Sequence, residues 1–167
     1  DYPNPISIYG KSKYLGEIAA GKYKNTLIIR LPLIFGPTHK KQIISKMLLK
    51  LKLNKRIWIA KDVYYTPAFS PNVSEFLFFV ISNKEKCFKK KLIHFDSNNY
   101  SSLSSFMKKL AKPINKAHLI NSVKDNFFKH KGIKPKNLGL KSKYNFDFWK
   151  KNKINTKDKN LLKYIKS

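Results

Sequence analysis

The sequence lacks several features that would point to particular classes of protein. It contains one cysteine, Cys87, so an internal disulfide is excluded, and a lone thiol fits a reducing compartment such as the cytoplasm. Cys87 is expected to be a small apolar residue at a helix end. The four histidines have neither metal-ligand spacing nor cysteine partners, so no metal site is predicted. The apolar run from Phe76 to Ile81 is far shorter than the roughly 20 residues of a membrane span, and no membrane partner is expected.

Glycine and arginine are also scarce. The six glycines form neither the Gly-x-Gly-x-x-Gly turn of dinucleotide sites nor a phosphate-binding P-loop. Basic residues number 36 against 9 acidic ones, yet only Arg30 and Arg56 are arginines, although arginine is a favoured reader of phosphates and bases. The lysines are spread along the whole chain, and Asn and Ile are abundant, which indicates an AT-rich codon bias. We therefore interpret the charge as a solvated surface that attracts phosphorylated ligands, with no specific nucleic-acid partner.

What the sequence does contain is the stretch Tyr-Gly-Lys-Ser-Lys-Tyr-Leu-Gly-Glu at positions 9–17. If Pro5 and Ser7 mark a helix entry, Tyr9 and Lys13 lie one turn apart on the same face. A fixed positive charge beside a phenol favours the phenolate and brings a tyrosine towards the range where it exchanges protons with a carbonyl oxygen. Chance also produces this pattern in a chain rich in both residues, and the pair would then be exposed and structural.

An apolar run follows the expected helix. Residues 26–37 read Thr-Leu-Ile-Ile-Arg-Leu-Pro-Leu-Ile-Phe-Gly-Pro. Such a run, stopped by Gly-Pro, predicts a strand that is buried on both faces of a parallel sheet.

These two stretches resemble the extended short-chain dehydrogenase/reductases, and among them the dTDP-4-dehydrorhamnose reductase group. The resemblance continues through Asp62 to Pro67, Leu92 to Asp96 and Lys134 to Leu140, and covers the chain to about residue 150. It implies an α/β fold class: the C-terminal part of a Rossmann-like, NAD(P)-binding fold with its small α/β substrate-binding region.

The resemblance also implies a domain organisation. Residues 1–40 would end the Rossmann-like domain, 41–150 would form mainly the substrate-binding region, and 151–167 would be a Lys/Asn-rich tail. Family members carry the glycine-rich loop far upstream of the tyrosine, and this sequence begins with Asp1. We therefore expect the N-terminal, nucleotide-binding half of the same chain to be missing here, which leaves any signal peptide open.

For the site, the resemblance implies that Tyr9 is the general acid or base at a sugar carbonyl. Lys13 would hold the nicotinamide ribose and tune the tyrosine, so that Tyr9, Lys13 and Pro32 bind the cofactor, NADP or NAD. Leu33 would face the sugar, although it departs from the polar or aromatic residue usual there. The family's third catalytic group, a Ser or Thr, lies on an earlier strand.

The function implied is NAD(P)H-dependent reduction of a 4-keto nucleotide sugar, by a fragment that is inactive alone. The alternatives are a nucleotide-sugar epimerase or dehydratase, and a non-catalytic regulatory subunit like the methionine adenosyltransferase β subunit. Departures such as Asn72 for an acidic residue and Lys134 for an arginine leave the sugar open. Asp62 is expected to be a satisfied loop carboxylate. The choice of NAD or NADP and the oligomeric state, with a homodimer among the candidates, are open too.

Periodicity and capping signals predict the remaining elements. The first are a helix over 42–52, a strand over 57–59 and a loop over 61–67, followed by a helix that is capped by Ser70 and buried nearly all round to Ser82. Next come a strand over 92–95, a helix from Ser101 or Ser102 to Leu110, a strand over 118–120 and a helical turn within 122–128. The last are a short helix capped by Thr156 and, before it, a segment docked by its aromatic residues Tyr144, Phe146, Phe148 and Trp149. The tail beyond Trp149 is expected to fray.

Overall fold

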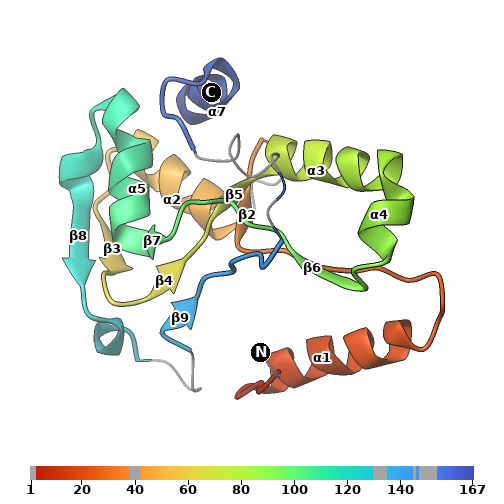
Figure 1. Ribbon diagram of the computed structural model, residues 1–167. Coiled ribbons are helices and arrows are strands. Elements are labelled where there is room, and N and C mark those ends of the chain that lie inside the picture. Colours follow the sequence, from red (N-terminus) through yellow and green to blue (C-terminus); the bar gives the residue numbers. More distant parts are fainter. Residues whose placement is uncertain (1–2, 38–41, 130–134, 145, 147–153) are drawn as a thin grey trace.

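The computed structural model describes residues 3–37, 42–129, 135–144, 146 and 154–167, and shows a mixed α/β fold (Figure 1). The helices of the described residues are α1 (Ile8–Gly21), α2 (Ile43–Lys52), α3 (Ser70–Ser82), α4 (Lys84–Phe88), α5 (Leu103–Ala111) and α7 (Lys159–Lys166). The strands are β1 (Ile28–Arg30), β2 (Ile34–Phe35), β3 (Ile57–Ala60), β4 (Tyr64–Tyr65), β5 (Ala68–Phe69), β6 (Leu92–His94), β7 (Ser101–Ser102), β8 (Ile120–Val123) and β9 (Asn137–Leu138).

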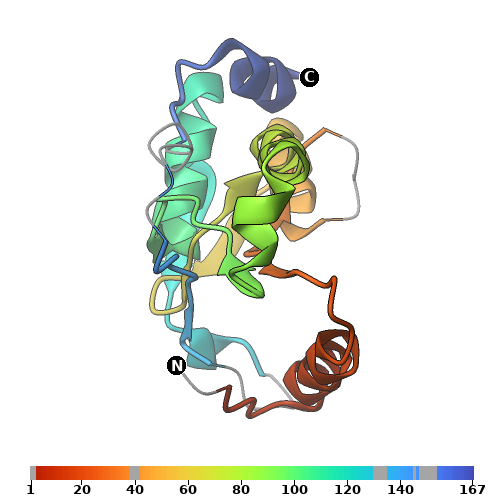
Figure 2. The ribbon, with the colours of Figure 1, turned by 45° about the vertical axis from the view of Figure 1, so that its right-hand side comes forward.

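The strands pair mainly in parallel, as the resemblance implies. β1 pairs with β6, β2 with β5 and β3 with β8, each in parallel, while β4 lies between the antiparallel β7 and the parallel β9. Both ribbon views place α1 on one side of the β1–β6 ladder, with α3 and α4 on the other (Figures 1 and 2). The ladder therefore separates the helix that carries the predicted catalytic pair from α3 and α4.

The apolar run at 26–37 differs from the single buried strand that was predicted. It forms two short strands, β1 and β2, and the residues of β1 are only half-buried. Between them the chain leaves β6 and joins β5, where the Leu33 carbonyl accepts a hydrogen bond from Ala68 N at 2.9 Å. Pro32 has no N–H to donate to a ladder, which suits it to this break.

Two hydrophobic cores meet at the β2–β5 pair. Because side chains alternate along a strand, Phe35 and Phe69 enter one core, while Ile34 and Ala68 face the other. The first core is formed largely by α2, β3, α5 and α7. The second is formed by α3, β6 and Phe146.

The helices predicted at α2 and α5 are confirmed. Ile44, Leu48 and Leu51 recur at helical spacing and are buried against the first core. Ser102 caps α5, since its hydroxyl accepts a hydrogen bond from Ser105 N at 3.2 Å. The predicted cap at α3 is wrong: Phe69 is the cap residue, and Ser70 is already the first helical residue.

The prediction that α3 is buried nearly all round is wrong as well. Val73, Phe76 and Val80 are buried, but Phe78 and Ile81 are 73% and 69% exposed. An apolar composition does not say which face of a helix meets the core, and one face of α3 points away from it.

The C-terminal tail docks on the protein. Ile154 is buried, and α7 inserts Leu161 and Ile165 into the first core, which overturns the expectation of fraying. The helix cap is Asp158, whose carboxylate accepts from Leu161 N at 2.9 Å, and not Thr156.

Four smaller predictions were shifted or partly correct. The strand predicted at 118–120 lies at β8, after a 3-10 turn over Ala117–Leu119. The expected loop at 61–67 contains β4, and the predicted helical turn is a 3-10 turn at Asp125–Phe127. In the aromatic-docked segment, Tyr144 and Phe146 pack on the second core; Phe148 and Trp149 lie outside the described residues.

Within the described part of the chain, every helix is too short or too polar to cross a lipid bilayer.

Candidate functional site

The helix α1 begins where the sequence predicts. Ser7 is extended, and its hydroxyl accepts a hydrogen bond from Gly10 N at 3.1 Å, which caps the first turn. Pro5 packs beside this turn, where a side chain added at Gly10 would lie 3.0 Å from the Pro5 Cβ. The local sequence thus fixes the start of the helix.

Tyr9 and Lys13 lie together on one face of α1. The Lys13 ammonium is 5.4 Å from the centre of the Tyr9 ring, a cation–π distance. The Tyr9 side chain is 72% exposed, and Lys13 is exposed too. Both polar groups are therefore accessible to a ligand, and they are close enough to act on the same one.

Pro32 and Leu33 lie outside this helix, in the connection from β1 to β2. Leu33 is half-buried and packs against the first core. Neither of these residues, nor Tyr9 or Lys13, lines either of the two cavities described below. The structure thus brings together Tyr9 and Lys13, while any role of Pro32 and Leu33 stays a prediction.

A network of polar side chains links α1 to the sheet. Arg30 donates from Nε and Nη2 to the two Glu17 carboxylate oxygens at 2.8 and 2.6 Å. Arg30 Nη1 lies 3.3 Å from His94 Nε2, and His94 Nδ1 lies 3.2 Å from the carbonyl oxygen of Lys141. If Arg30 donates to Nε2, the proton of a neutral His94 must be on Nδ1, where it can be donated to that carbonyl.

The electrostatics agree with a neutral His94. Partial burial, together with the neighbouring Arg30 charge, lowers the pKa of His94 below its ordinary value of 6.5. The hydrogen bond from Arg30 lowers the pKa of Glu17, and the same bond raises the pKa of Arg30. Glu17 and Arg30 are therefore both charged at neutral pH.

This network predicts a stability that depends on pH. The unfolded chain binds a proton at His94 more readily than the folded protein does. The contribution of His94 is therefore fully present above pH 6.5 and is lost as the pH falls from 6.5 through the lowered folded-state pKa. Urea unfolding at several pH values should show the free energy of unfolding falling over this range, and less steeply in His94→Gln.

A matched control is His118→Gln, because His118 is exposed. It should keep the pH dependence of the unmodified protein. If His94→Gln and His118→Gln gave the same curve, His94 would not be the group responsible.

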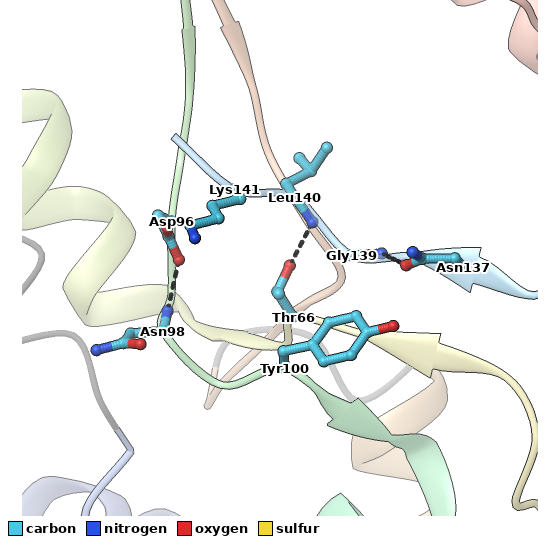
Figure 3. A pocket seen from close by; sticks show the side chains of 8 residues that line it. All are labelled: Thr66, Asp96, Asn98, Tyr100, Asn137, Gly139, Leu140 and Lys141. Carbon is cyan, nitrogen blue, oxygen red and sulfur yellow. Dashed lines mark hydrogen bonds between the residues drawn. The ribbon is translucent and has the colours of Figure 1, made fainter. Parts of the chain in front are cut away.

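A cavity of about 430 Å³ lies beside β4 and β9 (Figure 3). It is lined by Thr66, Asp96, Asn98, Tyr100, Asn137, Gly139, Leu140 and Lys141. Thr66 Oγ1 accepts a hydrogen bond from Leu140 N at 2.9 Å, and Asp96 Oδ1 accepts one from Asn98 N at 2.8 Å. Tyr100 stacks on Tyr64 with ring centres 5.5 Å apart.

Close packing restricts the residue at position 139 in the lining of this cavity. A Cβ atom at Gly139 would lie 2.8 Å from two carbons of the Tyr100 ring, so only glycine fits there without movement. A second cavity of about 650 Å³ shares Gly139, Leu140 and Lys141 with the first, and its lining also includes Arg30 and His94. The segment at 139–141 therefore lines both cavities, and the second cavity is also lined by Arg30 and His94 of the Glu17–Arg30–His94 network.

The sequence reasoning missed Glu17, Arg30 and His94 as a unit. Glu17 continues the four-residue spacing of Tyr9 and Lys13, so the sequence alone could have placed it on the same side of the helix. Its partners cannot be found that way, since Arg30 is 13 positions from Glu17 and on a strand, and His94 is 64 positions from Arg30.

Three other expectations concern single residues. Asp62 is a satisfied loop carboxylate, as expected: its Oδ1 accepts from Asp125 N at 2.7 Å. Cys87 is buried, and burial raises the pKa of its thiol, which suits a packing role. Lys134 lies outside the described residues. Within the described ranges, no three His, Cys, Asp or Glu side chains group closely enough to hold a metal ion.

Comparison with known proteins gives one family and many similar folds. The profile of the RmlD substrate binding domain family matches residues 1–157. No curated protein sequence matches the chain.

Three solved structures show the likeness. A dTDP-4-dehydrorhamnose reductase from Bacillus anthracis in complex with NADP is 23% identical, with a TM-score of 0.70 over 85% of this chain and 49% of that one. The reductase from Yersinia enterocolitica is 22% identical, with a TM-score of 0.73 over 99% and 58%. A dTDP-glucose 4,6-dehydratase from Bacillus anthracis in complex with NAD is 14% identical, with a TM-score of 0.70 over 98% and 52%. The chain thus has the Rossmann-like fold of the extended short-chain dehydrogenase/reductases and spans about half the length of these proteins.

Proposed function

Because this chain belongs to the RmlD substrate binding domain family, we propose that it provides the substrate side and the acid–base helix of an NAD(P)H-dependent reductase. The substrate proposed is a nucleotide sugar with a ketone at C4, as in the reductases that share the fold. The observation that carries the proposal is the exposed pair of Tyr9 and Lys13, side by side at the start of α1.

The proposed roles follow from the two functional groups. The phenol of Tyr9 donates its proton to the C4 oxygen, which turns the ketone into a hydroxyl. The Lys13 ammonium, a positive charge with three N–H donors, stabilises the negative charge left on the phenol. Bound NAD(P)H would supply the hydride that C4 receives.

The residues present fit one end of this cofactor. Lys13 is exposed, and no carboxylate of the described residues forms an ion pair with it, so its N–H groups are free to bind ribose hydroxyls. The carbonyl of Pro32 is a further acceptor. The sequence contains no glycine-rich loop for the pyrophosphate. We therefore propose that a nucleotide-binding N-terminal half of the same chain completes the site, and we call the combination the joined protein.

This proposal predicts that the 167-residue chain alone does not turn over substrate, whereas the joined protein does. The measurement is the consumption of NADPH, followed by absorbance, with dTDP-4-dehydrorhamnose as the substrate. Reduction of this ketone by the isolated chain, or its absence in a folded joined protein, would contradict the proposal.

The same assay separates the alternatives. An epimerase or a dehydratase would consume no NADPH, because each leaves its own substrate at the same overall oxidation level. A regulatory subunit would show no turnover in either form and would copurify with a synthetase.

A further inference from the structure

Among the residues that the structure describes, the helix α1 makes few contacts with other elements. None of its residues is buried, and Ile8 and Leu15 are 88% and 64% exposed. Of the side-chain hydrogen bonds formed by the described residues of α1, only those between Glu17 and Arg30 reach another element. Packing among these described residues therefore does little to fix the rotation of this helix about its axis.

The Glu17–Arg30 contact is well suited to fix that rotation. It is a two-point bond, with both oxygens of the carboxylate held by one planar guanidinium, so it restrains orientation as well as distance. The side chains of Arg30 and Glu17 are only 25% and 21% exposed, which limits the screening of the pair by water.

The geometry of the helix transfers this restraint to the predicted catalytic pair. Tyr9, Lys13 and Glu17 follow one another at intervals of four. Four residues of an α-helix turn by about 400°, so Lys13 lies roughly 40° and Tyr9 roughly 80° around the axis from Glu17. All three therefore share the side of α1 that Glu17 turns towards Arg30.

The other end of the contact is also held. Arg30 is on β1, and its remaining Nη1 group faces His94 on the paired strand β6. His94 in turn contacts the carbonyl of Lys141, in the segment that lines both cavities. The anchor of α1 is thus built on two strands and on the wall of a cavity.

We propose that Glu17 is a positioning residue: through Arg30 it fixes the rotation of α1 and so the direction of the Tyr9 phenol and the Lys13 ammonium. This inference rests on the proposed function for its catalytic consequence. Its structural part, the anchoring of α1, does not depend on any activity.

The test compares Glu17→Gln with Glu75→Gln, since Glu75 is an exposed glutamate on α3. In the 167-residue chain, Glu17→Gln should speed amide hydrogen exchange in α1 about tenfold and leave α5 unchanged. In the joined protein it should lower kcat about tenfold with little change in KM for the sugar. The double variant Glu17→Arg, Arg30→Glu, in which the two residues are swapped, should recover part of the lost kcat.

Each outcome decides between the alternatives. Unchanged exchange in α1, or faster exchange throughout the chain, would overturn the anchoring. Faster exchange confined to α1 with kcat unchanged in an active joined protein would overturn the positioning role. If the joined protein reduces no ketone at all, the proposed function fails, and exchange in α1 still tests the anchor by itself.

Discussion

Replacing Tyr9 by phenylalanine in the joined protein should lower kcat for ketone reduction by about 10²- to 10⁴-fold, the usual contribution of a general acid. The substitution removes one oxygen from a side chain that is 72% exposed and belongs to neither hydrophobic core of the described residues, so the fold should be unaffected. KM for the nucleotide sugar should change little, because the phenol acts mainly in the transition state. Steady-state kinetics with NADPH measure both constants.

The matched control is Tyr23→Phe. Tyr23 lies just after α1 and is 73% exposed, so it loses the same oxygen in a similar environment. It should keep nearly full activity. If both variants lost activity equally, or if Tyr9→Phe lost less than tenfold, Tyr9 would not be the proton donor.

The largest effect on stability is expected for Phe35→Ala. Phe35 is fully buried, and its ring lies 5.4 Å from those of Phe69 and Phe106 and 6.1 Å from that of Tyr164. It therefore joins β2 to β5, α5 and α7. Removing the ring should cost about 3–5 kcal/mol of unfolding free energy, through lost burial and the cavity left behind.

Urea unfolding measures this cost, with Phe78→Ala as the control. Phe78 is 73% exposed on α3, and its loss should change the free energy of unfolding by only about 0.5 kcal/mol. A cost below about 1 kcal/mol for Phe35→Ala would mean that the rings do not form a common core.

The elements that were predicted correctly are those whose signals are local. The start of α1 at Ser7 and the cap of α5 at Ser102 depend on residues within one turn. The helical spacing of the apolar residues in α2 likewise decides which of its side chains are buried. The break between β1 and β2 depends instead on which strand each segment pairs with, and the pairing partners, β6 and β5, are distant in the sequence.

The same distinction applies to the candidate site. Tyr9 and Lys13 could be found from the sequence because both lie on one helix, where a spacing of four means proximity. The contact of Thr66 with Leu140 spans 74 residues, and no spacing rule links them. The docking of α7 was missed because its apolar residues are few and stand among lysines, yet Leu161 and Ile165 share one buried face.

The most direct test of the account is a crystal structure of the joined protein with NADP and a dTDP-linked sugar. The account predicts the Tyr9 hydroxyl at hydrogen-bonding distance, about 2.6–3.2 Å, from the C4 oxygen, with the Lys13 ammonium against the nicotinamide ribose. A bound sugar whose C4 oxygen contacts other groups, with Tyr9 facing solvent, would contradict it.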